Sequence, residues 1–279
     1  MAEIKVDALS HVYSAGTPFE KKALNNITLT IPQGQFVGLL GHTGSGKSTL
    51  MQHFNALLAP TSGQILLDGE DINADKQSRK RAREKVGLVF QYPEYQLFEE
   101  TVYRDIAFGP KNMNLDEKEI DERVREAADF CGVDEEIFEK SPLELSGGQK
   151  RRIAIAGVIA MRPEVLILDE PTAGLDPLGC SQILDNICRY REISGATVII
   201  VTHNMDDIAR IANRLIVLAK GTVAMDGTPE EVFREPEKLR EIGLDIPKAT
   251  ELGMLLGLGG SIYTHEQLVA ALKKAKGVD

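Results

Sequence analysis

Residues 36–49 read FVGLLGHTGSGKST, a short apolar run that passes directly into a glycine-rich loop. A continuous apolar run of this kind is typical of a strand buried on both faces, and the apolar pattern that continues to Leu58 predicts a helix after the loop. The glycines permit backbone angles that turn successive N–H groups inward, so the loop forms an anion cradle at a helix N-terminus. This order of elements predicts a phosphate-binding loop rather than an ordinary glycine-rich turn.

The side chains of the loop fit the same interpretation. Lys47 can reach the terminal phosphates of a nucleotide, and the Ser48 hydroxyl can ligate Mg²⁺. The predicted nucleotide-binding residues of the loop are Gly41, His42, Thr43, Gly44, Ser45, Gly46, Lys47, Ser48 and Thr49.

Two further apolar runs, residues 165–168 and 196–201, have the same character and are separated by helical segments. Alternation of this kind predicts a parallel sheet with helices on its faces. Residues 4–13 and 24–31 alternate as half-buried strands, and the turn signals at residues 68–69 and 220–221 indicate hairpins. The expected fold is therefore α/β, with a mixed core sheet and an antiparallel β portion.

The domain organisation follows from shifts in this pattern. Residues 92–161 are mostly helical and predict a subdomain inserted into a sheet domain that spans residues 1–220. Asn114, three residues before Glu117, is the expected start of one of its helices. Residues 221–279 are interrupted by prolines, end in a helix near residues 266–276, and are interpreted as a C-terminal helical appendage.

Polar side chains follow the two later buried strands. Asp169 and Glu170 end the first of these strands, and His203 follows the second. The carboxyl ends of parallel strands meet at the edge where such folds bind ligands. Asp169 is expected to hold Mg²⁺, largely through water, and Glu170 to act as general base toward an attacking water. His203 could bind the terminal phosphate, although a histidine after a strand is more often a polar residue leaving the core. The imidazole rings of His11, His42, His53 and His265 receive that ordinary interpretation.

A second anion-ready helix start reads LSGGQKRR, with Ser146 as the expected N-cap and Gly148 and Gln149 beside it. The basic residues that follow oppose the helix dipole, so they are expected to serve another purpose. Gln91, at the end of the strand 86–90, could reach Mg²⁺ and the attacking water. Tyr13, at the end of the first strand, could stack on adenine, and simple packing is the alternative for both.

The composition limits the classes of function. The 279 residues include 32 Lys+Arg and 42 Asp+Glu, a net charge of −10 that argues against broad nucleic-acid binding. No apolar run approaches the ~20 residues that span a bilayer, and no secretory signal is visible at the N-terminus. Three scattered cysteines indicate free thiols in a reducing compartment.

Together these motifs resemble those of the ATP-binding-cassette (ABC) ATPases, over roughly residues 4–220. GHTGSGKS is similar to their Walker A motif, LSGGQ to their signature, VLILDE to their Walker B, Gly174-Leu175-Asp176 to their D-loop, and Gln91 and His203 to their Q-loop and H-loop. The resemblance implies ATP and Mg²⁺ as cofactors, with Ser48, Gln91 and Asp169 at the metal and Lys47, Gln91, Glu170 and His203 in catalysis. It also implies head-to-tail pairing, in which Ser146 and Gly148 act on a partner's nucleotide.

The segment QYPEYQLF, residues 91–98, is similar to the Q-loop region of energy-coupling factor (ECF) vitamin transporters. That resemblance implies the second member of an unlike ATPase pair, bound to a transmembrane coupling subunit and indirectly to substrate-binding membrane proteins. The expected location is the cytoplasmic face of the membrane, and the appendage is expected to stabilise the dimer.

Three alternatives stay open at this stage. The chain could serve another ABC importer, for cobalt, nickel or amino acids. It could be a soluble ABC ATPase acting on DNA or ribosomes, which its single cassette and its charge disfavour. A nucleotide-binding regulator without turnover is disfavoured by the presence of both Glu170 and His203.

Overall fold

The computed structural model describes residues 2–258 and 262–276 of the chain, arranged around a core sheet of six strands in the order β10-β9-β3-β8-β7-β6. Neighbouring strands are parallel except for β9 and β10, which form an antiparallel hairpin. The strands are β3 (Phe36–Leu40), β6 (Val86–Val89), β7 (Val165–Asp169), β8 (Thr197–Val201), β9 (Arg214–Ala219) and β10 (Thr222–Gly227). The predicted mixed core sheet is confirmed.

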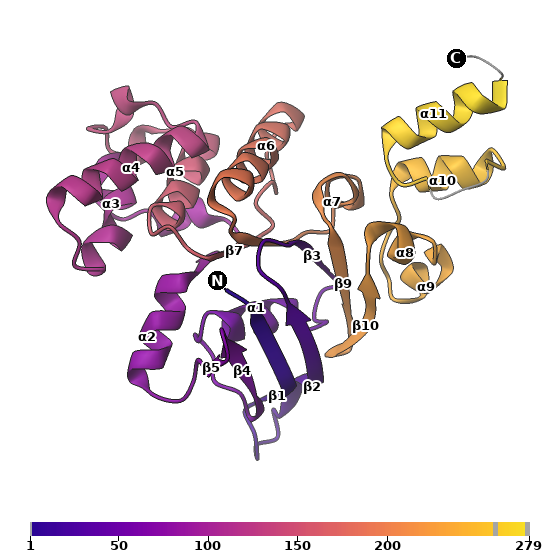
Figure 1. Cartoon of the computed structure of the whole chain (residues 1–279), viewed down its shortest axis with the longest axis horizontal. Helices are drawn as coiled ribbons and strands as arrows, with labels where there is room; N and C mark the ends of the chain where they lie inside the picture. Colours follow the sequence, from indigo (N-terminus) through magenta and orange to yellow (C-terminus); the bar gives the residue numbers. More distant parts are fainter. Residues whose placement is uncertain (1, 259–261, 277–279) are drawn as a thin grey trace.

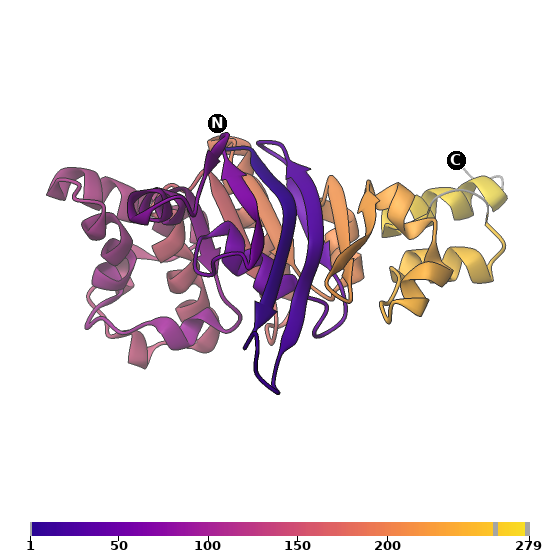
Figure 2. The ribbon, with the colours of Figure 1, turned by 90° about the horizontal axis from the view of Figure 1, so that it is seen from below.

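A second, antiparallel sheet has the order β2-β1-β4-β5 and lies against the core sheet (Figure 2). Its strands are β1 (Ile4–Tyr13), β2 (Lys21–Ile31), β4 (Ser62–Leu67) and β5 (Glu70–Asp71). The hairpin between β4 and β5 turns through Asp68 and Gly69, both at positive φ, as the sequence predicts.

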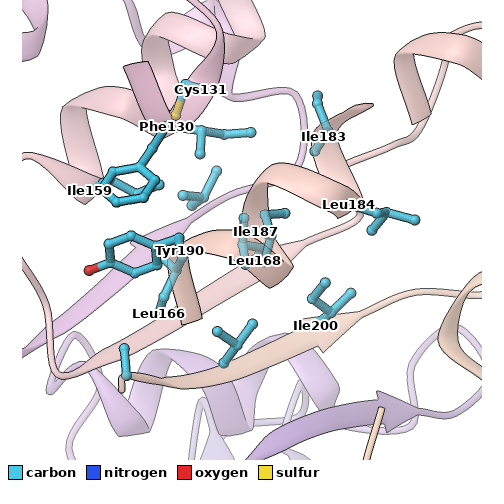
Figure 3. Close-up of a cluster of buried hydrophobic side chains, with 14 of the residues drawn as sticks. Phe130, Cys131, Ile159, Leu166, Leu168, Ile183, Leu184, Ile187, Tyr190 and Ile200 are labelled. Atoms are coloured by element: carbon cyan, nitrogen blue, oxygen red, sulfur yellow. The ribbon is translucent and has the colours of Figure 1, made fainter. Parts of the chain in front are cut away.

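The central strands of the core sheet, β3, β7 and β8, are buried on both faces because alternate residues enter two different hydrophobic clusters. Val165 and Ile167 pack in the cluster shared with the antiparallel sheet and with α1 (Lys47–Phe54). Leu166 and Leu168 pack on the opposite face, in the cluster that includes α6 (Pro177–Ser194) and α7 (Met205–Ile211). Figure 3 shows Tyr190 of α6 beside Phe130 and the strand residues Leu166 and Leu168.

The segment between β6 and β7 is helical and forms one end of the molecule (Figure 1). It contains the 3₁₀ turns η1 (Pro93–Gln96), η2 (Glu135–Ile137) and η3 (Pro142–Glu144) and the helices α3 (Val102–Asn112), α4 (Glu117–Cys131) and α5 (Gly147–Ile159). The predicted helix start at Asn114 is wrong. Asp116 is the N-cap of α4, because its carboxylate accepts the Glu119 N–H at 2.9 Å.

At the other end of the molecule, the residues that the structure describes after β10 form four short helices (Figure 1). They are α8 (Pro229–Phe233), α9 (Pro236–Glu241), α10 (Lys248–Leu255) and α11 (His265–Lys276). Pro229 and Pro236 begin helices, a position where the missing N–H costs nothing.

α2 (Lys76–Lys85) leads directly into β6. Within the described residues no helix has the length and apolar character needed to cross a bilayer.

Candidate active site

The carboxyl ends of β3, β6, β7 and β8 open onto a cavity of about 400 Å³. This edge collects the residues that the sequence singles out, because the four strands are parallel and each is followed by one of the motifs. The lining residues are Tyr13, Lys21, Ala23, Thr43, Gly44, Gly46, Lys47, Ser48, Thr49, Gln91, Asp169, Glu170, Val201 and His203.

The glycine loop after β3 has the conformation that its sequence predicts. Gly44 and Gly46 have φ of 82° and 109°, values that side chains with a Cβ rarely adopt. A Cβ on Gly46 would also lie 2.8 Å from the carbonyl oxygen of Ala23. The loop passes into α1 at Lys47, so its backbone N–H groups gather at a helix N-terminus, which suits a phosphate group.

Lys47 is held over this loop. Its ammonium donates hydrogen bonds to the carbonyl oxygens of Gly41 and His42, the latter at 3.1 Å. Burial lowers the pKa of Lys47, and the negative charges of Asp169 and Glu170 oppose that shift. The side chain therefore places a partly desolvated cation between the loop and the two acids.

Asp169 ends β7 on the floor of the cavity. Burial, and next the neighbouring charge of Glu170, raise the pKa of Asp169 to about 6, while Lys47 opposes the shift. A carboxylate that is costly to ionise in this way gains from a nearby cation. The oxygen donors of Ser48, Gln91 and Asp169 line one cavity and are of the hard type that Mg²⁺ prefers.

Glu170 and His203 meet across the ends of β7 and β8. Oε1 of Glu170 lies 2.7 Å from Nδ1 of His203, and because a carboxylate only accepts, the ring nitrogen donates. The Glu170 side chain is 13% exposed and the His203 side chain 80%. The backbone N–H of Glu170 donates to the carbonyl oxygen of Val201 at 2.8 Å, which ties the main chain at Glu170 to the end of β8.

The LSGGQ segment lies elsewhere, at the start of α5. Ser146 and Gln149 form a capping box, with the Gln149 N–H 3.3 Å from the Ser146 hydroxyl and the Ser146 N–H 3.0 Å from the Gln149 amide oxygen. Among the residues that the structure describes, the lining of the cavity does not include Ser146, Gly148 or Gln149. In this chain the predicted signature residues are therefore apart from the loop and the acids.

Sequence reasoning missed Lys21, Ala23 and Val201 in the cavity wall. Lys21 is the direct cross-strand partner of Tyr13 in the β1–β2 pair. The pairing register of the two alternating strands is the signal that could have found it.

Comparisons with known proteins agree with this geometry. A family model described as "ABC transporter" matches residues 24–173. The energy-coupling factor transporter ATP-binding protein EcfA2 of Caldanaerobacter subterraneus is 56% identical, with 89% of this chain and 87% of that protein covered. The protein of the same name from Clostridium tetani is 52% identical, with 97% and 96% covered.

A solved structure of cbiO1 from Clostridium perfringens, described as part of the ABC transporter complex cbiONQ, is similar with a TM-score of 0.77 and 42% identity. The match covers 91% of this chain and 98% of that one. This chain belongs to the nucleotide-binding ATPase domains of ABC transporters and, among them, to the energy-coupling factor transporter ATP-binding proteins.

Proposed function

We propose that this chain binds ATP and Mg²⁺ in the cavity and hydrolyses the ATP to power an ECF importer of vitamins or other micronutrients. The observation that carries the proposal is the 2.7 Å contact between Glu170 and His203 opposite the glycine loop. A regulator that binds nucleotide without hydrolysing it would not need a general base positioned in the nucleotide cavity.

The binding roles follow from the cavity wall. The N–H groups of the glycine loop and the ammonium of Lys47 receive the phosphates, and the Tyr13 ring, 37% exposed at the mouth, stacks on the adenine. Ser48, Gln91 and Asp169 would hold Mg²⁺, whose charge neutralises the phosphate oxygens during transfer.

The hydrolytic step assigns one proton transfer to Glu170. Its carboxylate accepts a proton from water as the water oxygen bonds to the γ-phosphorus and the bond to the bridging oxygen of ADP breaks. The Nδ1–H of His203 holds Oε1 of Glu170 in place, so the second carboxylate oxygen is left for the water.

The partners follow from surfaces that this chain leaves open. The signature at the start of α5 would complete a nucleotide site on a second, unlike ATPase subunit. The aromatic side chains of Tyr95, within η1, and of Phe98, just after it, are 84% and 65% exposed and suit a transmembrane coupling subunit. Substrate-binding membrane proteins then join through that subunit, and the chain sits peripherally on the cytoplasmic face.

The C-terminal appendage, residues 221–279, is assigned to stabilising the ATPase pair. Leu255 and Leu256 are 77% and 56% exposed at the end of α10, and such apolar side chains favour a protein contact. The boundary at residue 220 remains a prediction. The strand β10, which follows that residue, still belongs to the core sheet and extends it to Gly227.

A pull-down of the tagged chain from native membranes in mild detergent tests the proposed assembly. Recovery of an unlike ATPase, one coupling membrane protein and several small membrane binders is the expected result. Recovery of a dedicated permease pair would move the chain to another class of importer, and recovery with ribosomes or DNA would overturn the transport assignment.

A further inference from the structure

Four side chains form a closed set between β1 and the helix that begins at the glycine loop. The ring of His11 meets the ring of Tyr13 edge-to-face, with centroids 4.5 Å apart, and the ring of His53 in the same way at 4.7 Å. Nδ1 of His53 lies 2.7 Å from the carbonyl oxygen of Thr49. The Thr49 hydroxyl closes the set by a hydrogen bond to the Tyr13 hydroxyl at 3.1 Å.

This set differs from the ordinary interpretation of the two histidines as polar residues leaving the core. His53 is fully buried and His11 is 9% exposed. Both Nδ1 atoms face carbonyl oxygens, His53 that of Thr49 and His11 that of Ala59 at 3.2 Å, so both nitrogens donate and the ring orientations are fixed. Among the described residues, Nε2 of His53 has no hydrogen-bond partner.

Burying a histidine ring costs folding free energy unless its polar atoms find hydrogen-bond partners. A buried polar atom without a partner destabilises a protein, and an apolar side chain in place of His53 would avoid that cost. Burial lowers the pKa of His53 and the neighbouring His11 adds to that shift, while the backbone carbonyl of Thr49 opposes it, so the ring is favoured in its neutral form.

We propose that His11 and His53 are positioning residues, which hold the Tyr13 ring in the orientation that stacks on the adenine of ATP. The inference rests on the role of Tyr13 in the proposed function. Tyr13 ends β1 and is 37% exposed, so without lateral contacts its ring could turn away from the cavity. His11 lies two residues earlier on the same face of the strand, and His53 supports it from α1.

The expected size of the effect follows from the ring contacts. An edge-to-face aromatic pair is worth ~0.5–1.5 kcal/mol, which corresponds to a change in affinity of about three- to tenfold. Because His11 contacts Tyr13 and is not among the described residues that line the cavity, the loss in a His11 variant should fall on the base of the nucleotide alone.

Isothermal titration of the purified full chain with ATP and with inorganic tripolyphosphate separates the two contributions. His11→Ala should raise the Kd for ATP about three- to tenfold and leave the Kd for tripolyphosphate unchanged. His11→Phe, which keeps the ring contacts, should bind ATP like the wild type. Tyr13→Ala should weaken ATP binding at least as much, and the double variant no more than Tyr13→Ala. His265→Ala, at an exposed position of α11, is the matched control.

The outcomes that contradict the inference are distinct from those that contradict the proposed function. If Tyr13→Ala weakens ATP binding and His11→Ala does not, the positioning role is wrong and the adenine site stands. Equal losses for ATP and tripolyphosphate, or a loss in His11→Phe as large as in His11→Ala, also overturn the positioning role. Unchanged ATP affinity in Tyr13→Ala would remove the adenine site itself.

Discussion

The guanidinium of Arg151 donates two hydrogen bonds to the carboxylate of Glu94, from Nη2 to Oε1 at 2.8 Å and from Nε to Oε2 at 3.1 Å. Nη1 donates a third hydrogen bond to the carbonyl oxygen of Ala173. Arg151 therefore joins the start of α5, the turn η1 after Gln91 and the loop after Glu170. This contact explains a basic side chain near the N-terminus of a helix, where the dipole disfavours it.

Glu94→Ala should destabilise the chain by about 3 kcal/mol, because it leaves a charged side chain that is 3% exposed without its partner. Arg151→Met should cost less, since methionine fills the space and Glu94, 14% exposed, can still reach water. Denaturant unfolding measures both. Arg104→Met is the control, because its ion pair with Glu100 is exposed and should matter by less than ~0.5 kcal/mol. Equal, small effects for all three variants would contradict the view that the buried Arg151 depends on Glu94 for its charge partner.

Glu170→Gln should keep ATP affinity and slow turnover by roughly 10²-fold or more, the range for removal of a general base. Glutamine has nearly the same shape and keeps an acceptor for the Nδ1–H of His203. Steady-state hydrolysis and equilibrium ATP binding in the assembled pair measure the two properties. Lys47→Ala is the contrasting variant and should lose ATP binding itself. Near-normal hydrolysis by Glu170→Gln would show that another group activates the water.

Much of this site could be predicted from the sequence because each motif directly follows a buried parallel strand. Asp169, Gln91 and His203 needed only the rule that such strands end at one edge. Arg151 and Glu94 are 57 positions apart, and no local pattern pairs them. The Tyr13, His11 and His53 set likewise depends on how β1 packs on α1, which periodicity does not specify.

Asp169→Asn should stabilise the chain at pH 8. The pKa of Asp169 is raised from its ordinary 3.8 to about 6, so ionisation costs folding free energy from above pH 3.8, and the cost is complete above about pH 6. The difference in pKa corresponds to at most about 3 kcal/mol, and partial hydration of the cavity reduces the expected gain to about 1–2 kcal/mol. The cost shrinks as the pH falls through 6 toward 4, because the folded carboxyl becomes protonated first, and it vanishes only below the ordinary pKa of 3.8, where the carboxyl is protonated in both states.

Denaturant unfolding in EDTA at pH 8 and at pH 4 checks this prediction. The stability gain of Asp169→Asn should be full at pH 8 and mostly lost at pH 4. Asp245→Asn, at an exposed position, should change neither. A destabilised Asp169→Asn at pH 8 would mean that the ionised carboxylate supports the fold, contrary to the burial that raises its pKa.

Gly148→Ala tests whether the signature segment contacts the nucleotide of this chain or that of a partner subunit. A Cβ at Gly148 would meet Leu175 Cδ2 at 3.8 Å, an ordinary contact, and the position is helical, so alanine should leave the fold intact and stabilise it slightly. ATP affinity of the single chain should stay unchanged, because the signature does not line the described part of its cavity. In the pair, the added methyl group would meet the partner's nucleotide and lower hydrolysis by about 10²-fold, the scale of a 1 Å misplacement. Gly157→Ala, on the same helix with its nearest neighbour at 3.5 Å, is the control and should hydrolyse normally. Loss of ATP affinity in the single chain would place the signature on this chain's own nucleotide, and normal hydrolysis in the pair would remove it from the site altogether.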